Sequence, residues 1–349
     1  MRCYTFSNPN GAFDPARFSP GREISPDELP AGGVLILGSF DGVHRGHRSL
    51  FDAALSAAQQ APEPLPVVVW SLSGMHRACL TTEDEKRSFF RLFGASAAVF
   101  EDFEAIRDLS GEAFFREILQ KRLRPSALVC GFNFTFGRGA ACHPDDLVRL
   151  AEEAGIRAVV CPPVMDGEEA ISSTRIRALI ADGQMDEAAR LMGHPYPVKA
   201  AVCPGHRIGR TIGRPTLNQR LPAGKLTPPR GVYASLSLLS AEDGGSLCLT
   251  PSVSNLGSRP TVNKDGDDVT LETHILRADA PGTLRALECV PHLVVWLGEF
   301  LRPERKFDSL DALKAAIAAD TEAARLPISR MEGLAPGWDT PWTVDELLL

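Results

Sequence analysis

The chain has 349 residues, of which 44% are apolar and 23% are charged, and its net charge is −7. This length favours two domains of an ordinary globular protein, and the negative charge argues against nucleic-acid binding. The sequence has no apolar signal core at its start and no apolar run long enough to span a bilayer, and its eight cysteines include no Cys-x-x-Cys pair. We therefore expect reduced thiols, a cytoplasmic location and no membrane partner.

From residue 33 to about residue 165, short apolar runs alternate with segments of helical spacing. Continuous apolar runs that alternate with helices predict an α/β fold with a parallel, doubly wound sheet. Ligands of such sheets bind at the carboxyl ends of the strands. The predicted strands are 34–37, 67–70, 97–100, 127–130 and 158–161, and the predicted helices are 48–59, 84–94, 111–123 and 144–155.

The stretch that follows the first predicted strand is the most informative in the chain. Residues 38–47 read GSFDGVHRGH and lead into the predicted helix 48–59. Glycines let the backbone approach a ligand, and a helix start offers unpaired N–H groups and a partial positive charge to a phosphate. A lone histidine is usually a surface or core residue, but strand, glycines, two imidazoles and helix coincide here in order, which indicates a nucleotide site. The candidate nucleotide-binding residues are Gly38, Phe40 and Gly42, and the candidate catalytic residues are His44 and His47.

Two further segments are candidates for binding the same nucleotide. Residues 171–177 read ISSTRIR and begin a predicted helix that extends to Gly183. The hydroxyls suit an N-cap, but two arginines in a first helical turn oppose the helix dipole, and a bound triphosphate would remove that conflict. After another strand end, Asn133 could contact a base or ribose while the aromatic side chains around it pack. The candidate residues of these segments are Ser173, Thr174, Arg177 and Asn133.

The sequence pattern changes after about residue 190. Short runs punctuated by Pro, Gly and Thr replace the helical periodicity, which predicts a small antiparallel barrel or sandwich. A late helix is predicted from Ser309 to about Ala323. The predicted strands are 198–202, 231–239, 246–249 and 271–276. We expect an α/β domain over residues 1–188, a β domain over residues 189–325, and a tail without an assigned role over residues 326–349.

A second candidate site lies in the β domain. Residues 209–218 read GRTIGRPTLN, which is either a plain surface turn or a glycine-rich loop that lies under phosphates. In the second interpretation, the Thr216 hydroxyl and the Asn218 amide oxygen are hard ligands for the Mg²⁺ that accompanies ATP. Glu272 lies in an apolar run, where it either pairs with an arginine or acts as a general base on a substrate hydroxyl. The candidate nucleotide-binding residues of this site are Gly209, Gly213 and Thr216.

Together, and in this order, these clusters resemble the bacterial bifunctional riboflavin kinase/FAD synthetase family over roughly residues 30–325. The resemblance implies a Rossmann-like nucleotidyltransferase domain followed by a small antiparallel β-barrel riboflavin kinase domain with a C-terminal helix. The likeness rests on the histidine motif, ISSTRIR, the GRTIGRPTLN loop, and residues 231–234 (GVYA), 272–276 (ETHIL) and 300–307 (FLRPERKF).

The resemblance also implies two activities. The barrel would phosphorylate riboflavin to FMN with ATP, with Glu272 as the base and with Thr216 and Asn218 around Mg²⁺. The first domain would adenylylate FMN to FAD with a second ATP, and His44 and His47 would stabilise the charge on the transferring phosphate. Pyrophosphate would leave from beside Ser173, Thr174 and Arg177.

Two alternative functions remain open. In the first, the chain is a riboflavin kinase whose nucleotidyltransferase domain has diverged or is inactive, because residues 70–76 and 138–144 depart from the family pattern. In the second, which carries less weight, the chain is a non-catalytic flavin-binding regulator. A pure binder has no need of a base at Glu272. The sequence predicts no oligomeric state.

Overall fold

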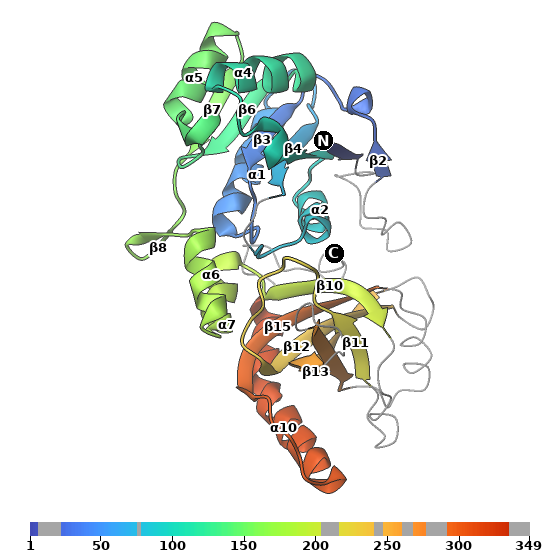
Figure 1. Ribbon diagram of the computed structural model, residues 1–349. Helices are drawn as coiled ribbons and strands as arrows, with labels where there is room; N and C mark the ends of the chain where they lie inside the picture. The colour runs from blue at the N-terminus through green and yellow to red at the C-terminus, as the bar shows by residue number, and fades with distance from the viewer. Residues whose placement is uncertain are drawn as a thin grey trace.

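A seven-stranded sheet with its helices and a closed six-stranded barrel lie end to end in the computed structural model (Figure 1). The sheet lies at the top of the view and the barrel below it, with a long helix extending from the barrel's lower end. The structure describes residues 1–5, 22–74, 78–203, 216–240, 247–259, 268–276 and 292–334.

The sheet has the strand order β2-β1-β5-β4-β3-β6-β7. The five strands from β5 to β7 in this order pair in parallel, which confirms the predicted doubly wound sheet. Two short strands at one edge, β1 and β2, are antiparallel and were not predicted, because three or four residues carry too little periodicity. The strands are β1 (Arg2–Thr5), β2 (Arg22–Ile24), β3 (Val34–Gly38), β4 (Val67–Ser73), β5 (Ala97–Asp102), β6 (Ala127–Gly131) and β7 (Arg157–Cys161).

Helices cover both faces of the sheet because alternate residues of each strand point to opposite faces. In β3, Val34 and Ile36 pack in the same core cluster as residues of α1 and α2, whereas Leu35 and Leu37 pack in the cluster of η3 and α5. The elements are η2 (Pro26–Glu28), α1 (Arg45–Gln59), α2 (Glu83–Leu92), α3 (Phe103–Ile106), α4 (Gly111–Ala113), the π-helical η3 (Phe114–Leu123), η4 (Arg138–Ala140) and α5 (Pro144–Glu153).

A short hairpin and two helices connect the sheet to the barrel. The hairpin is formed by β8 (Met165–Asp166) and β9 (Glu169–Ala170), and it protrudes at the left of Figure 1. Helix α6 (Ser173–Ala181) and helix α7 (Met185–Met192) follow, and their apolar side chains belong to the core cluster of the barrel interior. The expected boundary between residues 188 and 189 therefore falls inside α7.

The barrel is closed, with the strand order β10-β11-β14-β13-β12-β15 and antiparallel pairing throughout. This resolves the predicted alternative of barrel or sandwich. The glycine-rich loop interpretation missed β11, and β15 was not predicted. The strands are β10 (Tyr196–Cys203), β11 (Thr216–Arg220), β12 (Gly231–Ser240), β13 (Leu247–Arg259), β14 (Asp268–Ile275) and β15 (His292–Pro303).

The last helix, α10 (Leu310–Leu334), is longer than predicted. The expected end near Ala323 is wrong, because Ile328 and Met331 are buried against the barrel and hold the helix past Pro327. A Cβ on Gly298 of β15 would lie 2.3 Å from the Met331 sulfur, so the glycine is needed for this close approach. Residues 335–349 of the expected tail lie outside the described residues.

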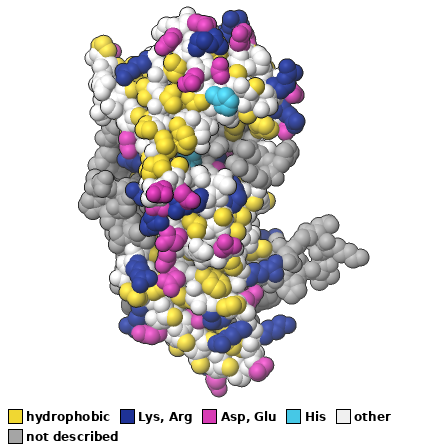
Figure 2. Space-filling model, turned by 90° about the vertical axis from the view of Figure 1, so that its left-hand side faces the viewer, with side chains coloured by type: hydrophobic (Ala, Val, Ile, Leu, Met, Phe, Trp, Pro, Cys, Tyr) yellow, Lys and Arg dark blue, Asp and Glu magenta, His cyan; other side chains and the backbone are white. Residues whose placement is uncertain are grey.

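Charged side chains of both signs are interspersed on the face shown in Figure 2. Some charges pair between neighbouring turns of one helix, as Arg149 does with Glu153 at 2.8 Å in α5. In the described part of the chain, none of the helices has both the length and the apolar character needed to cross a membrane.

Candidate functional sites

The turn between β3 and α1 is strained and tightly packed. Phe40 and Val43 have positive φ angles of 51° and 40°, a backbone conformation that residues other than glycine rarely adopt. Gly42 has a φ of 86°, and a Cβ at this position would lie 2.8 Å from a methyl carbon of Leu80. Such outliers persist only where the surrounding structure holds them, and they concentrate at functional sites.

His44 and His47 cap the start of α1 reciprocally. The His47 backbone N–H donates to His44 Nδ1 at 3.3 Å, and the His44 backbone N–H donates to His47 Nδ1 at 3.2 Å. The two rings stack with their centroids 3.7 Å apart, and a Cβ on Gly46 would lie 3.1 Å from the His44 ring. Because each Nδ1 accepts a hydrogen bond, each neutral ring carries its proton on Nε2. The cap thus leaves two Nε2–H donors at a helix N-terminus.

Burial keeps both imidazoles neutral. It lowers the pKa of His44 from 6.5 to about 3, against the opposing effect of Asp41. Burial also lowers the pKa of His47 well below 6.5, and the neighbouring His44 and Lys86 lower it further. At neutral pH the pair can therefore donate hydrogen bonds to phosphate oxygens without carrying charge of its own.

Asp41, which was not among the predicted site residues, joins the turn to α6. Its Oδ1 accepts hydrogen bonds from the backbone N–H groups of Leu80 at 2.7 Å and Thr81 at 3.3 Å. Ser173 Oγ donates to the Asp41 carbonyl at 2.7 Å, and Arg177 Nη2 lies 2.5 Å from Asp41 Oδ2. The structure therefore brings the predicted residues Ser173 and Arg177 to the histidine motif.

The two arginines of α6 are neutralised by carboxylates of the protein. Arg175 Nη2 lies 2.6 Å from Asp166 Oδ2, and Arg177 pairs with Asp41 and also donates to the carbonyl of Ala78. Carboxylates of the protein therefore offset the two charges at the helix start, and a triphosphate beside these arginines stays a prediction. The N-cap of α6 is Ser172, whose side chain accepts from the Arg175 N–H at 3.3 Å.

The other predicted residues of this site differ in exposure. The Phe40 side chain is fully buried against Phe51 and Phe90, with its centroid 5.2 Å from the His47 ring, so only its backbone can face a ligand. Asn133, on the connection after β6, and Thr174, in the first turn of α6, are both exposed. Gly38 ends β3, where an added Cβ would lie 3.0 Å from the Phe40 ring.

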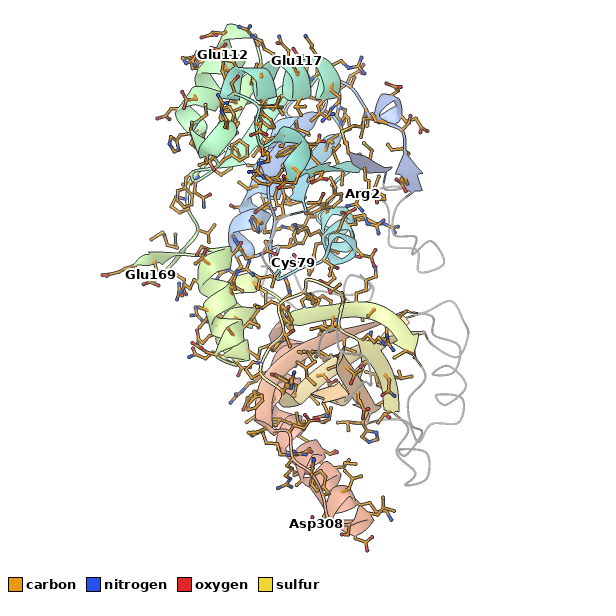
Figure 3. All side chains as sticks on the ribbon, in the orientation of Figure 1. Arg2, Cys79, Glu112, Glu117, Glu169 and Asp308 are labelled. Carbon is orange, nitrogen blue, oxygen red and sulfur yellow. The ribbon has the colours of Figure 1, made fainter. Side chains whose placement is uncertain are left out.

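A cavity of about 260 Å³ opens at the carboxyl ends of β3 and β4. Ser39, Asp41 and Lys86 line it from the sheet domain, and Gly224 lines it from the barrel. Lys86 Nζ donates to the Ser39 carbonyl at 2.7 Å, which places a cation beside the histidine turn. Cys79, labelled in Figure 3, also lines the cavity and lies between the sheet domain and the barrel. We call this cavity and the residues of the turn the His44–His47 site.

The second site lies on the outer face of the barrel. Asn218 of β11 and Glu272 of β14 are paired in register, and Glu272 is also paired with Asn255 of β13. Their sequence neighbours Leu217 and Leu271 belong to the interior cluster, so these polar side chains lie on the opposite, outer face. Thr216 lies two residues before Asn218 on β11, so both side chains are on that face. We call these four residues, Thr216, Asn218, Asn255 and Glu272, the Asn218–Glu272 site.

Of the residues expected in the second site, Gly209 and Gly213 lie outside the described residues. Glu272 is half-buried on the outer face, not enclosed by the apolar run that surrounds it in sequence. Asn255 was not predicted as a site residue, although it lies directly opposite Glu272. Its Nδ2 donates to Glu304 Oε1 at 3.4 Å, which brings the FLRPERKF segment toward the site.

The chain matches known proteins over both regions. A family model described as FAD synthetase matches residues 27–175, and one described as riboflavin kinase matches residues 192–327. A bifunctional riboflavin kinase/FMN adenylyltransferase of Escherichia coli K12 is 33% identical over 84% of this chain and 92% of that protein. The protein of the same name from Pseudomonas fluorescens is 34% identical over the same shares. This chain belongs to the bifunctional riboflavin kinase/FMN adenylyltransferase family.

A solved structure is also similar along nearly its whole length. It is described as a macrolide-efflux protein from Streptococcus pneumoniae, and it covers 86% of this chain and 96% of its own, with a TM-score of 0.70 and 28% identity. In this bifunctional family member, the region matched as FAD synthetase holds the histidine turn, and the region matched as riboflavin kinase holds Thr216, Asn218, Asn255 and Glu272. The segment between the two regions holds most of α6 and α7.

Three residues of the His44–His47 site escaped sequence reasoning for different reasons. Asp41 lies inside the histidine motif, so its position was a signal that could have been used. Thr81 and Lys86 lie about 40 residues further along the chain, in and beside a charged helix start that reads as an ordinary solvated surface. Only the fold brings them to the turn.

Proposed function

We propose that the Asn218–Glu272 site phosphorylates riboflavin to FMN and that the His44–His47 site adenylylates FMN to FAD, with ATP as the donor in both reactions. The family shows both activities together in one chain. The residue assignment rests on the placement of the two groups of residues in different domains. The reciprocal cap of His44 and His47 lies at a helix start of the sheet domain, whereas Asn218 and Glu272 lie opposite one another on a face of the barrel.

In the kinase reaction, Glu272 would accept the proton of the terminal ribityl hydroxyl while that oxygen attacks the γ-phosphorus and ADP leaves. Phosphoryl transfer needs mainly alignment and neutralisation of charge. Thr216 and Asn218 offer hydroxyl and amide oxygens on one strand face, the hard ligands that Mg²⁺ takes, so these residues fit the ion. Mg²⁺ bound there with ATP would neutralise phosphate charge. Asn255 would hold the Glu272 side chain from the neighbouring strand.

In the adenylylation reaction, a phosphate oxygen of FMN would attack the α-phosphorus of ATP, and pyrophosphate would leave. The Nε2–H groups of His44 and His47 would donate to phosphate oxygens as charge develops on them, and the N-terminus of α1 adds its partial positive charge. Lys86 would add a cation at the cavity wall. Ser173 and Arg177 would act on the turn through Asp41.

We further propose the domain division at about residue 188, with α7 as the joining element, and a cytoplasmic location. The location is supported by six free thiols, those of Cys3, Cys79, Cys130, Cys142, Cys161 and Cys203.

One observation favours the alternative of a kinase with an inactive nucleotidyltransferase domain. Arg177, which the family resemblance places beside the leaving pyrophosphate, is engaged by Asp41 and by the Ala78 carbonyl. If this pairing persists when ATP binds, the site lacks one phosphate cation.

Separate assays of the two reactions decide between these functions. The chain is incubated with FMN, ATP and Mg²⁺, and FAD and pyrophosphate are measured. His44→Ala should lower FAD formation and leave FMN formation from riboflavin unchanged, because the two sites lie in different bodies. FMN formation without any FAD formation would support the alternative.

A further inference from the structure

A segment of the barrel is inserted into the wall of the His44–His47 site. Gly224 and Lys225 follow β11, the strand that carries Thr216 and Asn218. The Cys79 N–H donates to the Gly224 carbonyl at 2.7 Å, and the Leu226 N–H donates to the Cys79 carbonyl at 2.7 Å. These two bonds form a short β-bridge between the domains, and Gly224 reaches the cavity lining.

Lys225 is the buried centre of this contact. Its side chain is 0% exposed, and its Nζ lies 2.6 Å from Oε2 of Glu85, whose side chain is 2% exposed. The same ammonium donates to the Leu80 carbonyl at 2.9 Å and lies 4.5 Å from the centre of the Tyr196 ring. A buried charge needs such a full set of partners, so the position of Lys225 is tightly specified.

Leu80 and Thr81 connect Lys225 to the catalytic turn. Their backbone N–H groups hold Asp41 Oδ1, and the Gly42 N–H donates to Thr81 Oγ1 at 2.9 Å. The carbonyl of the same Leu80 accepts from Lys225. Leu80 and Thr81 are therefore bonded both to the barrel, through Lys225, and to the histidine turn.

We propose that Lys225 is a positioning residue for FMN adenylylation, supplied by the kinase domain. It does not touch the reacting atoms; it fixes Leu80 and Thr81, which in turn fix Asp41 and the start of α1. This inference rests on the proposed function of the His44–His47 site. It predicts that adenylylation depends on a barrel residue although the barrel takes no part in that chemistry.

Lys199 provides a matched control at the same domain interface. It lies on β10, and its Nζ contacts Asp84 at 3.1 Å and Ser88 Oγ at 3.1 Å, both on α2. Its side chain is 8% exposed, and none of these contacts involves Leu80 or Thr81. A general loss of domain docking would affect the Lys199→Met and Lys225→Met variants alike.

The test uses the full chain carrying Lys225→Met or Lys199→Met. We expect Lys225→Met to lower the kcat of adenylylation about tenfold or more, because small displacements of a positioned group cost that much, and to leave riboflavin phosphorylation within about twofold. Lys199→Met should leave both reactions within about twofold of wild type. The side-chain ¹⁵N signals of His44 and His47 should shift in Lys225→Met and stay unchanged in Lys199→Met.

Adenylylation at the wild-type rate in folded Lys225→Met, or an equal loss in Lys199→Met, would overturn the inference. If Lys225→Met does not fold, two other variants are used. The double variant Lys225→Met/Glu85→Gln leaves no unpaired buried charge. Thr81→Val removes the hydroxyl that accepts from the Gly42 N–H, and so breaks the connection between Lys225 and the histidine turn at a later point. Each is then expected to lower adenylylation and spare phosphorylation, and wild-type adenylylation in both would overturn the inference. If wild type itself forms no FAD, the proposed function fails, and the imidazole signals alone decide on Lys225.

Discussion

Arg177 Nη2 lies 2.5 Å from Asp41 Oδ2, which joins two residues that are 136 positions apart in sequence. The Arg177 side chain is 21% exposed and that of Asp41, which lines the cavity, is 8% exposed, so the pair is mostly shielded from water. This contact makes α6 part of the histidine site and gives Asp41 a central place in it.

The first prediction concerns the charge of Asp41. Asp41→Asn keeps the size of the side chain but leaves Arg177 without its ionic partner, and breaking a largely buried pair costs about 3–5 kcal/mol. We expect a lower free energy of unfolding in urea and a fall in adenylylation of about tenfold or more, since the turn loses its support. Riboflavin phosphorylation should persist in the folded fraction. Unchanged FAD formation would show that the pair has no part in the reaction.

The second prediction concerns the base in the barrel. Glu272→Gln keeps the shape of the side chain but cannot accept a proton, so riboflavin phosphorylation should fall about 100-fold or more. FAD formation from added FMN should be unaffected. Glu299 is an exposed carboxylate of β15 that lies 3.5 Å from Arg330, and Glu299→Gln serves as the matched control. Phosphorylation close to the wild-type rate in Glu272→Gln would remove Glu272 from the mechanism.

The third prediction separates backbone strain from close packing in the histidine turn. Gly42→Ala places a Cβ at positive φ and 2.8 Å from Leu80, whereas Gly139→Ala places one at a φ of 67° with nothing within 4 Å. Strain alone costs about 1–3 kcal/mol, so both variants should be less stable in urea unfolding. Only Gly42→Ala should also lose adenylylation. Equal activity of the two variants would mean that the packing of Leu80 on the turn is irrelevant to the reaction.

The fourth prediction concerns stability in acid. Burial lowers the pKa of His44 to about 3 and that of His194 to about 4, and the pKa of His47 is also well below 6.5. In the unfolded chain these imidazoles bind protons below about pH 6.5, whereas the folded protein keeps them neutral. Unfolding therefore takes up protons, and the free energy of unfolding should fall between pH 6.5 and 4 by about 1.4 kcal/mol per pH unit for each imidazole.

Urea unfolding curves at neutral pH and at about pH 5 measure this dependence. The pKa of Asp166, lowered to about 2 by Arg190 and Arg175, contributes stability that is lost only below about pH 4, outside this window. His194→Gln should reduce the change in the free energy of unfolding per pH unit by the contribution of one imidazole. A free energy of unfolding that is equal at the two pH values would contradict the buried, neutral histidines.

The sequence was sufficient for the parallel core of the sheet, because buried strands such as 34–37 are continuous apolar runs next to clear helical patterns. It also drew attention to the histidine motif, to Ser173 and to the Thr216–Asn218 pair, because the spacing of these residues is local; their roles in a site stay predictions. It missed β11, since Pro, Gly and Thr mask a short strand, and it ended α10 too early, because the contact of Met331 with Gly298 is long-range. Lys225 could not be predicted for the same reason.

Whether one chain carries both ATP-dependent reactions can be measured by chromatographic separation of riboflavin, FMN and FAD after incubation of the chain with riboflavin, ATP and Mg²⁺. We expect FMN to appear first and FAD to form from it, with release of one pyrophosphate for each FAD. FMN that accumulates without FAD, or riboflavin that stays unchanged, would contradict the assignment of two ATP-dependent sites to this chain.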